Sequence, residues 1–285
     1  MVVVCHDTRD EVLDAVTSLP ADDIERVVVD AGSTDGTVAA LRSAHPDLDV
    51  RALTNVGFGR AANVGIRATD APVVVVANAD VRFTPGALDV LRRRFHTDAE
   101  VAAIGPRVTY PDGRIQASAR RLPDVPTAIG HAVFGRIAPG NRWTRRYHQR
   151  DADPDQPRDV DWLSGCALAL RRSAVDEIGG FDPGYFLYVE DVDLGQRLRA
   201  AGWRVRYEPA AEVTHGVGAS TGKRRLWALS VHASSLDRYL AAGLCGPRRL
   251  LRPLIPVALA GWVALTWISE RLARDGRSTT GERPT

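Results

Sequence analysis

The stretch VVVVANAD at residues 73–80 decides the fold of this 285-residue chain. Its opening run of valines is apolar without interruption, which is typical of a strand buried on both faces of a parallel sheet. The run then passes directly into Asn78, Ala79 and Asp80. Because ligands bind at the carboxyl ends of the strands in open α/β sheets, Asn78 and Asp80 are candidate site residues.

The sequence before this stretch repeats the same alternation of short apolar runs and helical periods. Strands are predicted at residues 2–5, 26–30, 49–53 and 73–77, and helices at residues 11–19, 37–44 and 60–68. This order predicts an α/β fold with a mostly parallel sheet flanked by helices.

The sequence after residue 80 is less regular. Strands are predicted at residues 166–170, 203–207 and 212–214, and a helix at 190–201. Residues 109–158 are rich in Pro, Gly, Arg and Asp without a stable period. A long loop of this kind is either a flexible, partly ordered acceptor-side segment or a plain surface excursion.

Composition and charge exclude several classes of protein. The formal net charge of +2 gives no general reason to expect nucleic acid as a partner. The cysteines Cys5, Cys166 and Cys245 form no CxxC pair, which argues against a disulfide scaffold or a structural zinc site. The apolar run at the N-terminus is too short for a signal peptide, so we expect a cytoplasmic protein with buried thiols.

The C-terminal region has a different character. Residues 254–268 are apolar except for Thr266, carry Trp262 and Trp267, and have arginines on both sides. About 20 apolar residues are needed to span a bilayer, so this segment fits a helix lying in the membrane interface. A buried core helix or a dimer contact remains the alternative. Residues 276–285 are predicted to be disordered.

Two glycine-containing motifs follow the second and third predicted strands. The first runs from Asp30 through Gly32 to Thr37, where the carboxylate can accept a nucleobase N–H or the polar residues can cap a helix. The second contains Asn55, Gly57 and Arg60 at a loop-to-helix junction, where backbone N–H groups and a guanidinium can hold an anion. The alternative for the second motif is a simple glycine-rich helix start.

Acidic residues and one histidine complete the set of candidates. A carboxylate such as Asp80 at a strand end can bind Mg²⁺ or Mn²⁺, or can simply form a turn. Glu190 and Asp191 open a predicted helix, where they either complement its dipole or supply a base for an acceptor hydroxyl. His215 follows a predicted strand and can be a further metal ligand or a structural histidine.

Taken in order, these motifs resemble an inverting family 2 glycosyltransferase of the GT-A fold, in its rhamnosyltransferase-like branch. The resemblance covers residues 2–220 and includes the Asp30 loop, the Asn55 motif, the Asn78-Ala79-Asp80 triplet, the pair Glu190-Asp191 and His215. The triplet stands where the family has Asp-x-Asp, so Asn78 removes one carboxylate ligand and lowers the expected metal affinity. The first strand also departs from the family pattern, because it ends in Cys5-His6-Asp7.

The resemblance implies roles for these residues. Asp30 and Asp7 would contact the nucleobase, and Asn55, Gly57, Arg60 and Asn78 would belong to the nucleotide-sugar site. Asp80 and His215 would hold Mn²⁺ or Mg²⁺ under the donor diphosphate. Asp191 would be the general base, with Glu190 positioning the acceptor or Asp191 itself.

The implied function is transfer of a sugar, with rhamnose from dTDP-rhamnose as the first choice, to a glycan or a polyprenyl-diphosphate-linked acceptor in cell-wall or surface polysaccharide assembly. The catalytic domain is expected at residues 1–220, with a donor half at 1–110 and an acceptor half at 111–220. A membrane-associated helical segment is expected at 221–275, which would place the protein at the inner face of the cell membrane.

The rival interpretations are transfer of galactofuranose, mannose or glucose, and a catalytically silent scaffold protein that binds a nucleotide sugar. A nucleotidyltransferase would need a glycine-rich basic loop after the first strand, where this chain has residues 7–10 with the sequence DTRD. The sequence does not specify an oligomeric state.

Overall fold

The computed structural model describes residues 1–19, 24–122, 127, 138, 140–149, 151–216, 225–244 and 246–278. The chain forms two compact units, Met1–Ser220 and Thr221–Thr285. The first unit contains the sheet, and the second contains helices.

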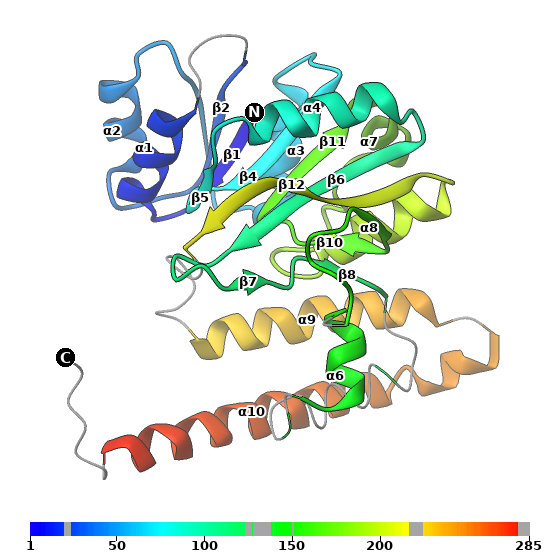
Figure 1. Ribbon diagram of the computed structural model, residues 1–285. Helices are drawn as coiled ribbons and strands as arrows, with labels where there is room; N and C mark the ends of the chain where they lie inside the picture. Colours follow the sequence, from blue (N-terminus) through cyan, green and yellow to red (C-terminus); the bar gives the residue numbers. More distant parts are fainter. Residues whose placement is uncertain are drawn as a thin grey trace. The chain divides into compact units, whose positions relative to one another are not determined.

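Four parallel strands form one half of the large sheet, in the order β3-β2-β1-β4 (Figure 1). They are β1 (Val2–Cys5), β2 (Val27–Ala31), β3 (Asp49–Leu53) and β4 (Val73–Asn78), connected by α1 (Arg9–Ser18), α2 (Thr37–Ala44) and α3 (Phe58–Arg67). Val2 and Val4 pack in one core with α3, whereas Val3 and Cys5 pack in another with α1 and α2. Burial on both faces explains the continuously apolar sequences of β1 and β2, whereas β3 at the edge of the sheet is partly exposed.

The other half of the sheet is mixed. β11 (Ala167–Arg171) runs antiparallel between β4 and β6 (Val101–Thr109), β6 is parallel to β12 (Arg204–His215), and β5 (Val81–Phe83) pairs antiparallel with β12. α4 (Ala87–Thr97) packs against β6 and β12. The predicted α/β class is confirmed, with a parallel arrangement among β1 to β4 and a mixed one beyond them.

Two stretches of this half differ from the prediction. β5, α4 and β6 lie within residues 81–109, for which no element was predicted, because Gly105 and Pro106 interrupt the apolar pattern of β6. The two strands predicted at 203–207 and 212–214 form one strand, β12, and the chain around Pro209 is accommodated by an irregularity in pairing between Glu208 and Glu212.

Residues 109–158, which the sequence left open, contain short described elements. β7 (Ile115–Gln116) pairs with β6, and β8 (Ala119–Arg120) pairs with β10 (Trp162–Leu163) in a separate small sheet. α6 (Arg142–Tyr147) begins after Asn141, whose side chain accepts a hydrogen bond from the Thr144 backbone N–H. β9 (Arg158–Val160), α7 (Arg172–Ile178) and α8 (Glu190–Ala200) complete the unit.

The second unit consists of α9 (Arg225–Gly243), a 3₁₀ turn η2 (Gly246–Leu251) and α10 (Leu254–Ser278), with α9 and α10 in contact. Asp237 on α9 accepts hydrogen bonds from Arg252, and the rings of His232 and Trp262 lie 5.7 Å apart. α10 contains the predicted apolar helix and reaches three residues into the predicted tail; residues 279–285 lie outside the described part, as does Cys245. None of the described helices is both long and apolar enough to cross a bilayer.

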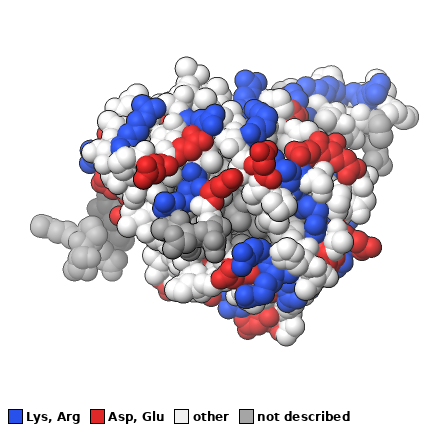
Figure 2. All heavy atoms as spheres, turned by 90° about the horizontal axis from the view of Figure 1, so that it is seen from above, with Lys and Arg blue, Asp and Glu red and all other residues white. Residues whose placement is uncertain are grey.

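Charged side chains of both signs are interspersed on the face shown in Figure 2. Many charged residues of the chain form ion pairs, such as Arg204 with Asp98 and Asp159, both at 2.9 Å. Exposed pairs of this kind each contribute at most about 1 kcal/mol to stability.

Candidate active site

The candidate residues gather because the strands are parallel and in register. Cys5 lies opposite Asp30 on β2, and Val4 lies opposite Asn78 on β4. Since carboxyl ends of parallel strands lie at one edge of a sheet, the residues at the ends of β1 to β4 and just after them lie along that edge. These residues are Asp7, Asp30, Asn55, Asn78 and Asp80.

Asp30 is buried, with 2% of its surface exposed, and holds its own loop. Its Oδ2 accepts hydrogen bonds from the backbone N–H groups of Gly32 at 3.2 Å and Ser33 at 3.0 Å. The Cys5 thiol lies 3.6 Å from Oδ1, and burial together with this carboxylate raises the pKa of Cys5. Asp30 therefore shapes the loop that follows β2, whereas the helix α2 begins after Gly36 without a side-chain cap from that residue.

Asp7 links the ends of β1 and β2. Its Oδ1 accepts a hydrogen bond from the Thr34 backbone N–H at 2.7 Å, and its own N–H donates to Ser33 Oγ at 2.8 Å. The neighbouring His6 places Nε2 3.2 Å from Asn55 Nδ2, which adds the end of β3 to the cluster. Sequence reasoning missed His6, because a single histidine at a strand end has no distinguishing pattern.

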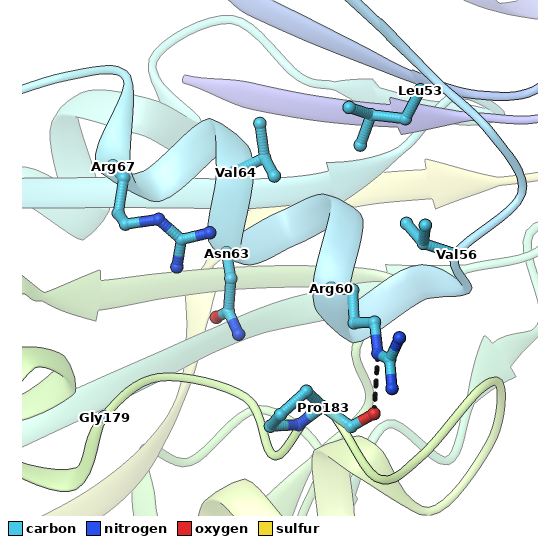
Figure 3. Close-up of a pocket in the computed structure, with 8 residues that line it drawn as sticks. All are labelled: Leu53, Val56, Arg60, Asn63, Val64, Arg67, Gly179 and Pro183. Carbon is cyan, nitrogen blue, oxygen red and sulfur yellow. Dashed lines mark hydrogen bonds between the residues drawn. The ribbon is translucent and has the colours of Figure 1, made fainter.

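The Asn55 motif contacts the loop that leads into α8. Gly57 has a φ of +85°, and the Phe58 N–H donates to the carbonyl oxygen of Phe186 at 3.0 Å. Arg60 Nε donates to the carbonyl oxygen of Pro183 at 2.7 Å (Figure 3). This bond lies beside a cavity of about 460 Å³, lined by Leu53, Val56, Arg60, Asn63, Val64, Arg67, Gly179 and Pro183.

Asp80 and His215 form the candidate metal centre. Their Oδ1 and Nε2 atoms are 3.2 Å apart, and both side chains are largely buried. His215 Nδ1 lies 3.0 Å from Gln116 Oε1, which orients the ring with Nε2 toward Asp80. Gln116 was missed because it lies in the two-residue strand β7 within the aperiodic segment. Asn78 Nδ2 is also 3.4 Å from Nε2.

The charge of His215 depends on these neighbours. Burial disfavours the imidazolium, but the hydrogen bond to Asp80 and the contact with Cys166 outweigh it and raise the pKa of His215 to about 10. Across the described residues, no group of three or more His, Cys, Asp and Glu side chains is arranged to hold a metal ion. Asp80 and His215 are a pair and not a group of this kind.

Glu190 and Asp191 begin α8 in a strained and buried setting. The two residues before them, Tyr188 and Val189, have φ values of +66° and +69°, a backbone region that residues other than glycine rarely adopt. Glu190 is 6% exposed, and its Oε2 atom has no hydrogen-bond partner. Burial and the neighbouring charge of Asp191 raise the pKa of Glu190 to about 8.

Asp191 is held by backbone donors. Its Oδ2 accepts from the Gly165 N–H and its Oδ1 from the Val192 N–H, both at 2.9 Å. Burial raises the pKa of Asp191, whereas these hydrogen bonds and the charge of Arg120 act in the opposite direction. The outcome is a carboxyl group with a raised pKa in a fixed orientation, which suits a proton acceptor.

Two adjacent residues connect the metal pair with Asp191. The Gly165 N–H binds Asp191, and the carbonyl oxygen of Cys166 accepts a hydrogen bond from the Asn78 N–H at 2.9 Å. Asp191 and the triplet ending in Asp80 therefore lie on either side of one short backbone segment. Arg60 is placed differently, since its hydrogen bond among the described residues is with Pro183.

The chain is similar to several known proteins. The sequence profile described as Glycosyl transferase family 2 matches residues 1–179, and that of Glycosyl transferase family 21 matches residues 158–274. An N-acetylglucosaminyl-diphospho-decaprenol L-rhamnosyltransferase of Mycobacterium tuberculosis is 42% identical over 229 residues, which cover 75% of this chain and 74% of that protein. The rhamnosyltransferase WbbL of Escherichia coli is 40% identical over 82 residues, 29% of this chain and 31% of its own.

The fold is also similar to that of a solved enzyme. A mannosyltransferase of Pyrobaculum calidifontis, determined in complex with GDP-Man and Mn²⁺, superposes with a TM-score of 0.55. The match covers 99% of this chain and 80% of that one at 18% sequence identity, so the likeness concerns the fold.

Proposed function

The chain belongs to glycosyl transferase family 2, and from this premise we propose that it is an inverting, metal-dependent rhamnosyltransferase. The proposed donor is dTDP-rhamnose, and the proposed acceptor is a hydroxyl of a sugar carried on a polyprenyl diphosphate. The similarity to the mycobacterial rhamnosyltransferase supports both choices. The proposed process is the assembly of cell-wall or surface polysaccharide.

The observation that carries the mechanism is the position of Asp191 next to the end of β4. Asp191 takes the proton of the acceptor hydroxyl as the hydroxyl oxygen forms a bond to the anomeric carbon. The bond from that carbon to the donor phosphate oxygen breaks on the opposite face, and the nucleoside diphosphate leaves with the bonding electrons. One displacement inverts the anomeric centre and needs a base but no enzyme nucleophile.

The raised pKa of Asp191 makes it a stronger base than an exposed carboxylate. The two N–H groups that bind its oxygens fix the direction in which it accepts the proton. The buried, unpartnered Oε2 of Glu190 stands beside it as a group that can position the acceptor or Asp191.

The pair Asp80 and His215 fits a divalent cation. Two ligand atoms about 2.1 Å from one ion, at right angles to each other, lie about 3 Å apart, and Oδ1 and Nε2 are 3.2 Å apart. Mg²⁺ typically uses only one or two protein side chains and completes its shell with phosphate oxygens and water. When bound, such an ion neutralises charge on the departing diphosphate.

The donor nucleotide is assigned to the loops after β1, β2 and β3. Asp7, Asp30 and Asn55 lie there, with the buried Asp30 shaping the loop that would meet the base. Gly57 lets the backbone turn toward the diphosphate at a φ of +85°. Arg60 keeps its predicted anion-binding role through its terminal nitrogens, since Pro183 occupies only Nε.

Contact with the inner face of the membrane is part of the proposal. α10 exposes Leu254, Val257 and Leu265 to 60%, 70% and 71%. Apolar side chains next to arginines suit a helix in a membrane interface, where a lipid-linked acceptor would be found.

The decisive experiment is an assay of the purified full chain with dTDP-rhamnose and a polyprenyl-diphosphate-linked N-acetylglucosamine, with Mn²⁺ or with a chelator. We expect a rhamnosylated lipid, formed only with the metal, whose new linkage has the opposite anomeric configuration by NMR. Preference for the nucleotide sugars of galactofuranose, mannose or glucose would replace the donor assignment. Tight donor binding without turnover on any acceptor would favour the catalytically silent scaffold.

A further inference from the structure

Arg120 lies on β8, which pairs with β10, the strand that leads to the Gly165 backbone N–H bound to Asp191. In the small sheet, Arg120 on β8 pairs with Trp162 on β10, and β10 packs against α8 (Figure 1). The Ser164 N–H then donates to the Ser118 carbonyl oxygen at 2.7 Å, and the next residue, Gly165, binds Asp191. The charge of Arg120 acts on Asp191, which agrees with this proximity.

The guanidinium of Arg120 is fixed by aromatic rings instead of an acid. Its central carbon lies 4.9 Å from the ring centre of Trp162 and 5.4 Å from that of Tyr147. Nε donates to the Ala117 carbonyl oxygen at 2.8 Å. Within the described part of the chain, Arg120 forms no ion pair with a carboxylate. A half-buried guanidinium that is oriented and not neutralised is an arrangement suited to binding phosphate.

The order of contacts assigns this cation to the acceptor side. Arg120 and Trp162 lead through Gly165 to Asp191, and from there Cys166 leads to Asn78 and the metal pair. In a direct displacement, the acceptor hydroxyl and the leaving diphosphate stand on opposite faces of the anomeric carbon. An anion next to Arg120 would therefore belong to the acceptor.

We propose that Arg120, held between Tyr147 and Trp162, binds the diphosphate of a polyprenyl-diphosphate-linked acceptor and thereby sets the sugar hydroxyl beside Asp191. The inference rests on the proposed function, because it requires Asp191 to act on an acceptor of this class. It adds a binding residue that the sequence motifs do not contain and explains how an anionic acceptor can be preferred over a neutral one.

The test compares two acceptors in the full chain carrying Arg120→Gln, with Arg121→Gln as the matched control at the exposed neighbouring position. One acceptor is N-acetylglucosamine on a short prenyl diphosphate, and the other is the neutral octyl N-acetylglucosaminide. For Arg120→Gln we expect KM for the diphosphate acceptor to rise at least about tenfold, because hydrogen bonds to charged groups typically contribute that much to affinity. KM for the donor and KM for the neutral acceptor should not change, and Arg121→Gln should resemble the wild type.

An equal rise of KM for both acceptors would mean that Arg120 acts on the fold and not on the acceptor diphosphate, and would overturn the proposal. Calorimetry of the diphosphate acceptor without donor or metal makes the test independent of turnover. If the wild type binds this acceptor and Arg120→Gln does not, the acceptor site stands even where no rhamnose is transferred. Equal binding by both proteins would refute the site.

Discussion

Gly57 lies so close to Phe186 that a Cβ atom on Gly57 would stand 2.0 Å from the Phe186 carbonyl oxygen. The same contact includes the hydrogen bond from the Phe58 N–H to that oxygen at 3.0 Å. The glycine-rich motif after β3 is thus joined directly to the loop that leads into Glu190 and Asp191 at the start of α8. The donor side and the proposed base are held by one piece of backbone.

We therefore expect Gly57→Ala to displace the loop before Asp191 and to lower the transfer rate at least about tenfold, since small misplacements of reacting groups cost that much or more. The control is Gly86→Ala, where φ is +81° but no atom lies within 4 Å of the new Cβ. It should lose about 1 kcal/mol of stability from backbone strain and retain its activity. Initial rates and thermal midpoints of both variants check this, and equal activities would contradict the coupling.

Asp191→Asn should lower the transfer rate about 10²–10⁴-fold, because an amide cannot take the acceptor proton. Donor affinity should remain, since Asp191 binds the Gly165 N–H and does not lie among the strand-end residues assigned to the nucleotide. Asp193→Asn in the same helical turn is the control, because Asp193 pairs with Arg197 at 2.7 Å and the substitution removes a carboxylate of this turn that is not assigned to the reaction. Single-turnover rates and donor binding by calorimetry distinguish the two variants. Retained turnover in Asp191→Asn would remove Asp191 from the base role.

Asp80→Ala should weaken binding of the donor nucleotide about tenfold or more in the presence of Mn²⁺, and much less in the presence of a chelator. The physical reason is that His215 would be the remaining side chain of the pair. Asp70→Ala is a suitable control, because Asp70 is exposed and lies before β4. If donor affinity depends on Mn²⁺ equally in Asp80→Ala and in the wild type, the metal assignment is wrong.

The sequence predicted the part of the fold in which short strands alternate with helical periods. β1 to β4 and α1 to α3 were expected within a few residues of their observed bounds, and the family and the α/β class are confirmed. β6 was missed because Gly105 and Pro106 interrupt it, although Gly105 is required where a Cβ would lie 2.5 Å from Leu163. β12 was divided at Pro209 for the same reason.

The candidate site was predictable where residues lie at or next to an end of a periodic element, as Asp30, Asp80 and Asp191 do. It was not predictable where contacts between distant residues decide the role. Gln116, which orients His215, and Arg120 both lie on two-residue strands formed only by pairing with other parts of the chain. Arg60 was a candidate because of its motif, but its hydrogen bond to Pro183, 123 residues away, could not be inferred from that motif. The functional roles of these residues remain predictions.

A triple variant in which Leu254, Val257 and Leu265 are each replaced by Gln should no longer float with vesicles that contain anionic lipids. These side chains are exposed on α10, and each buried leucine-sized side chain contributes about 1.5–3 kcal/mol to membrane binding. Ile115→Gln is the control, since Ile115 is a 46% exposed apolar residue of the first unit. Flotation that is the same in the triple variant and the wild type would rule out α10 as the membrane contact.

Glu190→Gln should change how stability depends on pH. The pKa of Glu190 is raised from 4.5 to about 8 in the folded chain, so the native state holds a proton that the unfolded state has released. The contribution of Glu190 to the free energy of unfolding is therefore fully present below about pH 4.5 and is lost as pH rises toward 8. The wild type should show this decline in thermal midpoint between pH 5 and 8, on top of other titrations, and Glu190→Gln should reduce it because an amide stays neutral.

Since Glu190 and Asp191 titrate as a pair, Asp191→Asn should also move the decline to lower pH by removing a neighbouring charge. Identical pH profiles for the wild type and Glu190→Gln would show that Glu190 is already ionised in the folded protein, and would leave its buried Oε2 atom without the proton assigned to it here.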